Sequence, residues 1–386
     1  MPTPAYAVAG AVAPTVAAHL QLHRAALPPQ DPDQPPRELL PEARHIEALV
    51  DVAFWASVRR EEGYIPKISL AFLRPTPDVC PLVFEQPLPL DPTALTRLAA
   101  AVERPAIHLG VWPAAGAHAS DGPIVVWGTT HLIPPFCFVV EVVAPGVIVL
   151  KHRPRHESRK FVNVAVLEGD RIKIIDERAS GIVDCPAVLT SMLGFDHTSL
   201  QDERLAIQAQ LALSMRRHGR GGILLVVPAG SAEWRASIVH PMRYAVQPPH
   251  CEIADLLGRR DTIPPHEWHE ALDRAVESLA GLTAVDGAAI ITNRYELLAF
   301  GAKIARRDGN GPVEQMLVTE PVLGARPHRM HPGDLGGTRH LAAAQFIHDQ
   351  RDALALVASQ DGRFTIFSWS PCDTAVHAHR VEVLLL

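Results

Sequence analysis

The segment GGILLVVPAG, residues 221–230, decides the fold of the second half of the chain. A short and continuous apolar run that begins after paired glycines is typical of a β-strand whose two faces are both covered. A helical pattern over residues 199–219 comes directly before it. We therefore predict that a central sheet flanked by helices begins here.

Two further apolar segments extend this predicted sheet. Residues 285–304, VDGAAIITNRYELLAFGAKI, predict two strands with a turn near Asn293–Arg294. Residues 352–369, DALALVASQDGRFTIFSW, predict a buried strand and an alternating partner joined at Asp361–Gly362. A helix is expected at about 265–280. The pattern predicts a mixed α/β domain over residues 199–386.

The first half of the chain has shorter elements. An amphipathic helical pattern starts near residue 42, and a second helix is expected after Asp91, a typical N-cap that is followed by Pro92. Two hairpins are expected to turn at Pro145–Gly146 and Gly169–Asp170. Strand-like runs occupy residues 68–73, 81–86, 106–112 and 123–130. This pattern predicts an α+β domain over residues 42–198.

Residues 1–41 are rich in alanine and proline. The apolar start lacks a preceding Lys or Arg and is interrupted by Pro4 and Pro14, which argues against a secretion signal. We predict a flexible leader that ends in a proline-rich linker, residues 27–41. No apolar stretch in the chain reaches the length of a membrane-spanning helix.

Composition limits the classes of partner. The formal net charge is -6, whereas proteins that bind nucleic acid as their main partner carry an excess of Lys and Arg. The five cysteines are scattered and odd in number, which indicates neither a disulfide framework nor a zinc site. We therefore expect a cytoplasmic protein without a strong nucleic-acid site.

The segment LGGTRHLAAAQF, residues 335–346, is the main candidate for a binding site. Gly336 and Gly337 allow close backbone approach, and we expect Thr338 to cap a helix that starts near Arg339. A helix start favours an anion, and Arg339 and His340 add donors beside it. The pattern predicts a phosphate site. The alternative is an ordinary capped helix with an exposed Arg and a hydrogen-bonded His.

A second segment, VDGAAII at residues 285–291, opens a predicted buried strand. Asp286 could hold a divalent cation, and Gly287–Ala288 could let a flat ring or a phosphate approach the backbone. An Asp-Gly pair alone is usually a turn. Its combination with residues 337–340 and with ASQDG at 358–362 favours a nucleotide site.

These three motifs, in this order, resemble those of the diadenylate cyclase (DAC) domain, the nucleotide-binding domain of DNA integrity scanning proteins. That family has Asp-Gly-Ala, Gly-Thr-Arg-His-Arg and Val-Ser-Glu-Glu, where this chain has DGA at 286–288, GTRHLAA at 337–343 and ASQDG at 358–362. GRGGILLVV at 219–227 is similar to the family's first core strand. The resemblance covers roughly residues 200–370.

The front half is similar to DACNV, a probable sensor domain that precedes DAC domains in some bacterial proteins. The likeness is carried mainly by IVVWGTT at 124–130 and VVEVVAPGVIVLKHR at 139–153. Together the two resemblances imply a sensor-regulated signalling enzyme.

The DAC resemblance implies a cyclase that condenses two ATP into cyclic di-AMP and two pyrophosphates, with Mg2+ or Mn2+, in a homodimer or higher homo-oligomer. Each ribose 3'-hydroxyl would attack the α-phosphate of the opposite nucleotide. The implied catalytic residues are Asp286, which would also bind the metal, Arg339 and His340. The implied nucleotide-binding residues are Gly287, Ala288, Gly337, Thr338, Arg339, His340 and Ser359.

Some positions depart from the family pattern. Leu341 replaces the second arginine of the family motif, Gln360–Asp361 replaces the Glu-Glu pair, and Val285 replaces a polar residue. Arg326, Arg329 or Lys303 could supply the missing cation. The alternative function is therefore a DAC-like nucleotide-binding sensor module with weak or absent catalysis.

Other motifs have simpler explanations. HEWHE at 266–270 lacks the spacing of a zinc protease and suits a helix start after Pro264–Pro265. His328 and His331 lack an evident third ligand, and the basic segment 151–160 is read as a solvated connection rather than an anion-binding loop. Trp234 and Trp268 are expected in the core rather than as base-stacking platforms.

Overall fold

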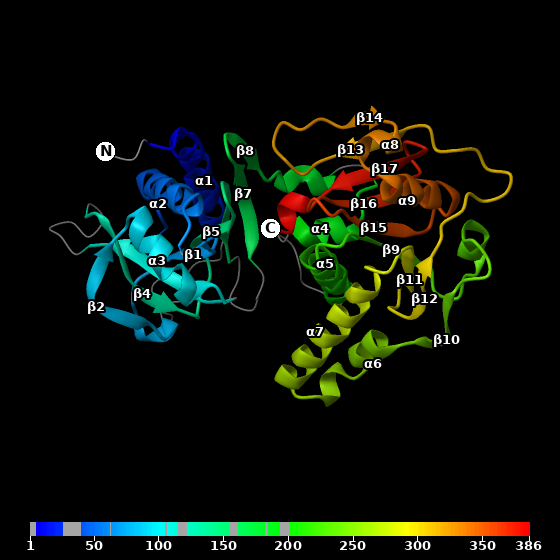
Figure 1. The fold of residues 1–386 in the computed structure, drawn as a ribbon, viewed down its shortest axis with the longest axis horizontal. Coiled ribbons are helices and arrows are strands. Elements are labelled where there is room, and N and C mark those ends of the chain that lie inside the picture. The colour runs from blue at the N-terminus through cyan, green and yellow to red at the C-terminus, as the bar shows by residue number, and fades with distance from the viewer. Residues whose placement is uncertain are drawn as a thin grey trace. The chain divides into compact units, whose positions relative to one another are not determined.

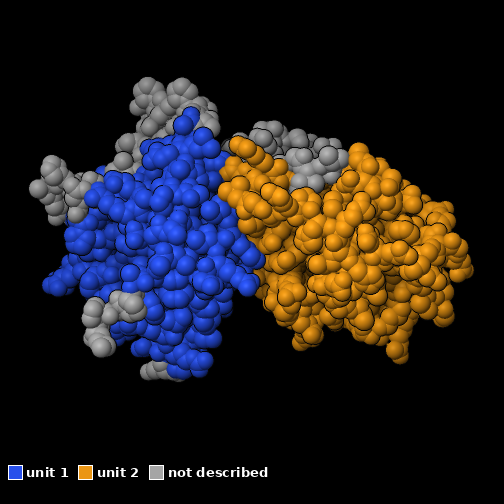
Figure 2. All heavy atoms as spheres, turned by 90° about the horizontal axis from the view of Figure 1, so that it is seen from above, with its two compact units in different colours: residues 1–175, 386 blue, residues 176–385 orange. Residues whose placement is uncertain are grey.

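The chain folds into two compact units, each built on a mixed β-sheet, in a computed structural model (Figure 2). Unit 1 comprises residues 1–175 with Leu386, and unit 2 comprises residues 176–385. The structure describes residues 5–25, 40–61, 63–104, 106–114, 122–153, 161–181, 184–193 and 201–386. The predicted mixed α/β class is confirmed.

The sequence suggested a boundary between the units after residue 198. In the structure the boundary follows Ile175. Helix α4, Ala187–Leu193, buries Val188, Leu189 and Met192 in a core that it shares with α5 of unit 2. Apolar packing of this short helix therefore assigns the preceding segment to the second unit.

The sheet of unit 1 has eight strands in the order β2-β4-β3-β1-β5-β6-β7-β8. Strands β1 and β3 are parallel, and the other neighbours are antiparallel. The two predicted hairpins are present, with turns at Pro145–Gly146 and Gly169–Asp170. The strands are β1 Ile68–Phe72, β2 Leu82–Pro89, β3 His108–Pro113, β4 Ile124–Thr130, β5 Phe138–Ala144, β6 Val147–His152, β7 Val162–Glu168 and β8 Arg171–Ile174.

Three helices of unit 1, α1 Ala7–Ala25, α2 Ala43–Ser57 and α3 Pro92–Val102, share its main core with the sheet (Figure 1). Asp91 caps α3 as predicted, because its carboxylate accepts hydrogen bonds from the amides of Thr93 and Ala94 at 2.8 and 2.9 Å.

The prediction of a flexible leader is wrong for residues 7–25, which form α1. Val12, Val16 and Leu20 recur at helical spacing and are fully buried in the core of unit 1. Burial of each such side chain contributes about 1.5–3 kcal/mol. Together they outweigh the cost of Pro14 inside the helix, about 3 kcal/mol. Residues 26–39 of the predicted leader lie outside the described part.

The sheet of unit 2 has nine strands in the order β10-β12-β11-β9-β15-β16-β17-β13-β14. Strand β9 lies at its centre and is buried along its whole length, as the opening segment predicted. The strands are β9 Gly222–Val227, β10 Tyr244–His250, β11 Ala288–Thr292, β12 Leu297–Ala302, β13 Met316–Thr319, β14 His328–Met330, β15 Leu354–Ala358, β16 Phe364–Ser370 and β17 Ala375–Arg380.

Helices cover both faces of this sheet (Figure 1). Leu224 and Val226 of β9 face a core shared with α4, α5, α6 and α7, whereas Ile223 and Leu225 face a core shared with α9. The helices are α5 Gln201–Arg217, α6 Glu252–Gly258, α7 Pro265–Leu282, α8 Pro332–Leu335 and α9 Thr338–Asp349.

Strand pairing defines two opposite ends of the central strands. Strand β9 is parallel to β11, with Ile223 opposite Ala288, and antiparallel to β15, with Gly222 opposite Ala358. The starts of β9 and β11 and the end of β15 therefore lie together. We call this the site end, defined by Gly221, Asp286 and Ser359, and the opposite end, next to Val227, the cavity end.

Among the helices of the described residues, none combines the length and the apolar content that crossing a membrane requires.

Candidate functional site

The sheet brings the three predicted motifs to the site end. Gly221 precedes β9, Asp286 lies two residues before β11, and Ser359 follows β15 directly. The register of these strands makes the three positions neighbours, although they are far apart in sequence.

Arg339, in the first turn of α9, reaches the same place. Its guanidinium packs against Gly221, where a Cβ would lie only 2.7 Å from Arg339 Nη1 and 3.1 Å from the carbonyl oxygen of Ala358. Gly221 also has a φ of +71°, which favours glycine. The absence of a side chain at this position therefore gives the arginine its place beside the sheet.

Asp286 presents an exposed carboxylate at the site end. Its side chain is 91% exposed and forms an ion pair with Lys303, which follows β12. The hydrogen bond and charge of Lys303, together with the charge of Arg339, lower the pKa of this carboxyl. Asp286 and Arg339 are thus close enough to interact and carry opposite charges near neutral pH.

The sequence offered Arg326, Arg329 and Lys303 as cations that could stand in for an arginine at position 341. Of these, Lys303 forms an ion pair with Asp286. Arg329 lies on β14, at the far edge of the nine-stranded sheet from β11, so it cannot replace a donor at the site end. Lys303 therefore places a positive charge beside Asp286, from the end of β12.

Gly287 and Ala288 have a packing role that their motif did not reveal. Gly287 has a φ of +119°, and a Cβ there would lie 2.5 Å from the carbonyl carbon of Gly301 on β12. Ala288 is fully buried. A ligand at this point would meet the backbone around Gly287 rather than the Ala288 side chain.

The start of α9 differs from the prediction by one residue. The helix begins at Thr338, and Gly337 is the N-cap, without a side-chain capping bond. Thr338 therefore lies within the first turn, where it does not cap the helix. Gly337 and Thr338 are both exposed, beside the half-buried Arg339.

His340 does not face solvent beside Arg339, as the sequence suggested. Its ring is buried, with Nε2 3.4 Å from the Thr365 hydroxyl, and it packs so closely under Gly336 that a Cβ there would lie 2.3 Å from Nδ1. Burial lowers the pKa of His340, so the imidazole is neutral near pH 7. In this position the ring is not placed to hold a phosphate, because helical geometry turns it toward the sheet.

The segment after β15 forms a tight turn at the site end. The Ser359 amide donates to the Arg363 carbonyl at 2.9 Å, and the Gly362 amide donates to the Ser359 carbonyl at 3.2 Å. Gln360 donates through Nε2 to the Arg220 carbonyl at 3.3 Å. Ser359 is half-buried and lies next to Ala358, whose carbonyl is close to Arg339.

The simpler explanations of the other motifs hold where the structure describes them. HEWHE lies in the first turns of α7, which has Pro265 at its first position. Trp268 and Trp234 are buried and donate to the carbonyls of Leu256 at 2.8 Å and Ser231 at 3.1 Å. His331 Nδ1 accepts a hydrogen bond from the Gly333 amide at 3.1 Å. Residues 154–160 of the basic segment lie outside the described part.

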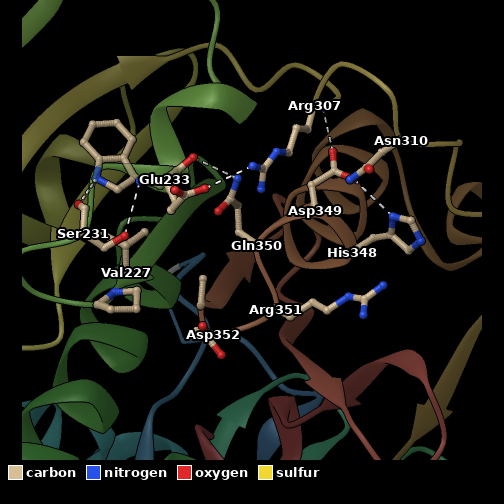
Figure 3. Close-up of a pocket in the computed structure, with 13 residues that line it drawn as sticks. Val227, Ser231, Glu233, Arg307, Asn310, His348, Asp349, Gln350, Arg351 and Asp352 are labelled. Carbon is tan, nitrogen blue, oxygen red and sulfur yellow. Dashed lines mark hydrogen bonds and ion pairs between the residues drawn. The ribbon is translucent and has the colours of Figure 1, made fainter.

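Sequence reasoning missed a cavity of about 370 Å³ at the cavity end (Figure 3). Its walls come from three separated segments, so no local motif marks it. The lining residues are Val227, Pro228, Ser231, Glu233, Trp234, Arg307, Asn310, His348, Asp349, Gln350, Arg351, Asp352 and Ala353.

Asp349 is the centre of a hydrogen-bond network in this cavity (Figure 3). Its side chain is fully buried and accepts from the Arg307 amide at 2.9 Å and from Asn310 at 2.8 Å. Gln345 at 3.1 Å and His348 at 3.2 Å complete the set. Burial alone would raise the pKa of Asp349, but these hydrogen bonds outweigh it and lower the pKa. The network holds the end of α9 to the neighbouring loop.

Comparisons with known proteins match one part of the chain to a family model and one part to a solved structure. No curated protein matches the chain. A solved structure, a hypothetical membrane spanning protein from Bacillus cereus, is similar to 46% of this chain at 14% identity and a TM-score of 0.27. The chain covers 63% of that protein, and a likeness of this degree carries no argument about fold or function.

Residues 35–131 match the family model described as probable sensor domain DACNV. The match lies wholly within unit 1 and includes α2, α3 and strands β1 to β4. It does not reach the motifs of unit 2. This part of unit 1 is accordingly similar to the probable sensor domain DACNV.

Proposed function

We propose that unit 2 is a diadenylate cyclase domain that binds ATP at the site end, under the control of the sensor domain in unit 1. The observation that carries this proposal is that Asp286 and Arg339 lie at the same end of the sheet, where the charge of Arg339 acts on the Asp286 carboxyl and the guanidinium packs beside Gly221. A carboxylate and a guanidinium on rigid elements supply the metal ligand and the cationic clamp that phosphoryl transfer requires.

The proposed reaction needs two copies of the site. In each half-reaction a ribose 3'-oxygen forms a bond to the α-phosphorus of the opposite ATP, the 3'-hydroxyl loses its proton, and pyrophosphate leaves. Arg339 would stabilise the negative charge on the phosphate oxygens, and Asp286 lies at the open surface where a second copy would face it. The exposure of Asp286 supports a site that is completed by a homodimer.

The donor set at the site end fits Mg2+ or Mn2+. Mg2+ in phosphate-transfer sites is commonly held by one or two carboxylates together with substrate phosphates. Asp286 provides one such carboxylate, ionised and accessible, and Lys303 would exchange its partner for a phosphate oxygen. A bound metal would neutralise phosphate charge and favour ionisation of the 3'-hydroxyl.

The test is turnover of ATP by the full chain with Mg2+ or Mn2+, with the product identified by mass spectrometry. Asp286→Asn should lower the rate at least roughly 100-fold, because it removes the charged metal ligand. Asp273→Asn, at an exposed position on α7, is the matched control and should keep the rate. Absence of cyclic di-AMP from folded dimer with either metal would contradict the cyclase proposal.

A second candidate is a nucleotide-binding sensor module without turnover. It is favoured by Leu341, which is 41% exposed where the family has an arginine, and by the buried ring of His340. This candidate predicts that ATP or cyclic di-AMP binds without synthesis and that Arg339→Ala abolishes the binding. Arg217→Ala, which changes an exposed arginine of α5, is the matched control. Calorimetry with each ligand distinguishes the two candidates when combined with the turnover assay.

A further inference from the structure

Three histidines of unit 1, two from one helix and one from a strand distant in sequence, lie close together. His19 and His23 are four residues apart and therefore lie on one face of α1, and His152 is the last residue of β6. The ring centroids are 4.4 Å apart for His19 and His23, 5.7 Å for His19 and His152, and 5.9 Å for His23 and His152. The three imidazoles form a compact cluster, which we call the histidine cluster.

His152 is buried without a hydrogen-bond partner. Its exposed fraction is 0%, and neither Nδ1 nor Nε2 has a partner within hydrogen-bond geometry. Buried polar side chains in native proteins nearly always have a partner, and a bound ion is one of the recognised reasons for an exception. Phe136 stacks on the other side of the ring at 5.9 Å, so the ring is held by packing.

The protonation state of His152 suits a metal ligand. Burial, together with the charges of the neighbouring His19 and His23, lowers its pKa to about 3. The Arg153 backbone opposes this shift in part. The ring is thus neutral at physiological pH, the form in which imidazole nitrogens bind metals.

The spacing of the cluster agrees with one shared ion. Zinc–nitrogen bonds of about 2.0–2.1 Å place tetrahedrally arranged imidazole centroids about 5 Å apart. The three observed separations lie on both sides of this value. The ligand nitrogens of His19 and His23 also lie within 4.8 Å of each other, a distance that the His152 nitrogens do not meet with both of them. Binding of one ion by all three rings would therefore require a side-chain rotation that brings a His152 nitrogen toward those of His19 and His23.

We propose that the histidine cluster is a transition-metal site of the zinc class, with three imidazole ligands and a fourth position open to water or to another ligand. Imidazole nitrogens favour Zn2+ and its neighbours over Mg2+ and Ca2+, which prefer oxygen ligands. The site is separate from the proposed ATP site and lies in the unit that carries the DACNV match. A metal ion would therefore be an input of this unit.

The experiment uses the full chain, freed of metal by a chelator and titrated with Co2+ and then with Zn2+. Co2+ should produce the visible absorption of tetrahedral nitrogen coordination, and Zn2+ should displace it at one tight equivalent per chain. The double variant His19→Asn/His23→Asn should lose that equivalent, with an affinity lower by at least roughly 100-fold. These two side chains lie on a partly exposed helix face, and circular dichroism checks that the variant is folded.

His131→Asn, which changes an exposed histidine of unit 1, is the matched control and should keep the tight equivalent. Asp286→Asn should also keep it, so a failure of the cyclase proposal is separable from a failure of this one. The proposal is overturned if the unaltered chain shows no tight equivalent, or if the folded double variant binds Co2+ as tightly as the unaltered chain.

Discussion

The two ends of the central strands in unit 2 use charged residues in opposite ways. At the site end, Asp286 is almost fully exposed and is paired with the flexible side chain of Lys303. At the cavity end, Asp349 is fully buried and accepts four hydrogen bonds. The exposed carboxylate of Asp286 remains available to a ligand. The carboxylate of Asp349 is fully hydrogen-bonded within the protein and stabilises the fold.

Solvent explains the contrast. An exposed ion pair is weakened by water and salt and can exchange partners at little cost. A buried carboxylate has lost its hydration, so each donor around it is needed, and removal of the carboxylate leaves those donors without a partner. Charge at the site end is therefore suited to function, and charge at the cavity end to stability.

The largest effect that would test this contrast is on stability. Asp349→Ala should lower the free energy of unfolding by about 3 kcal/mol, because it leaves several buried donors unsatisfied. The matched variant Asp286→Ala should leave the urea midpoint unchanged, because the carboxylate that it removes is exposed. Urea unfolding followed by circular dichroism measures both. Equal midpoints for the two variants would remove the distinction between the ends.

The pH dependence of stability should separate the two ends in a second way. The pKa of His340 is lowered from 6.5, so the unfolded chain binds the proton first and stability falls as the pH falls below about 6.5. The pKa of Asp349 is lowered from 3.8, so its contribution is complete above that value and is lost as the pH falls further, through the pKa of the folded state. Each group changes the free energy of unfolding by at most about 1.4 kcal/mol per pH unit.

His340→Asn should therefore flatten the decline that begins below about pH 6.5, and Asp349→Asn should flatten only the decline below about pH 4. Urea midpoints at a series of pH values provide the measurement. The critical result is the order of the two pH ranges in which stability declines. If the decline that His340→Asn removes occurred at lower pH than the one that Asp349→Asn removes, the surroundings of one group would be misassigned.

The smallest expected effect concerns the departure from the family motif. Leu341→Arg adds a cation beside Arg339 on the exposed side of the first turn of α9. If the site end binds phosphates, ATP turnover should rise by roughly fivefold to tenfold, as expected for an added charged hydrogen bond. Leu341→Gln is the control for loss of the apolar side chain. A rise that is equal in both variants would assign the effect to polarity rather than to charge.

Much of the local structure could be predicted from the sequence. Alternating or continuous apolar runs predicted strands such as β1, β9 and β15, and Asp91 with Pro92 predicted the start of α3, because these patterns depend on neighbouring residues. The proline-containing start was misjudged because Pro14 lies inside α1, although the buried apolar stripe of the helix continues on both sides of it. Edge strands such as β10 and β14 were missed, because their sequences lack an apolar pattern.

The candidate site was only partly predictable. Motif order marked Asp286, Arg339 and Ser359 as a set, and strand pairing places them at one end of the sheet. The inward turn of His340, the ion pair of Lys303 and the packing need at Gly287 all depend on segments distant in sequence. No local pattern carries that information.

By itself, the sequence determined which segments become strands and helices and which residues can carry charge, because backbone preference and apolar periodicity act over a few residues. Only the tertiary structure decided which of those charges are exposed, which are buried and which histidines meet. Burial and contact are set by chain segments that approach through folding, so the availability of Asp286 and the enclosure of Asp349 and His152 follow from packing rather than from residue type.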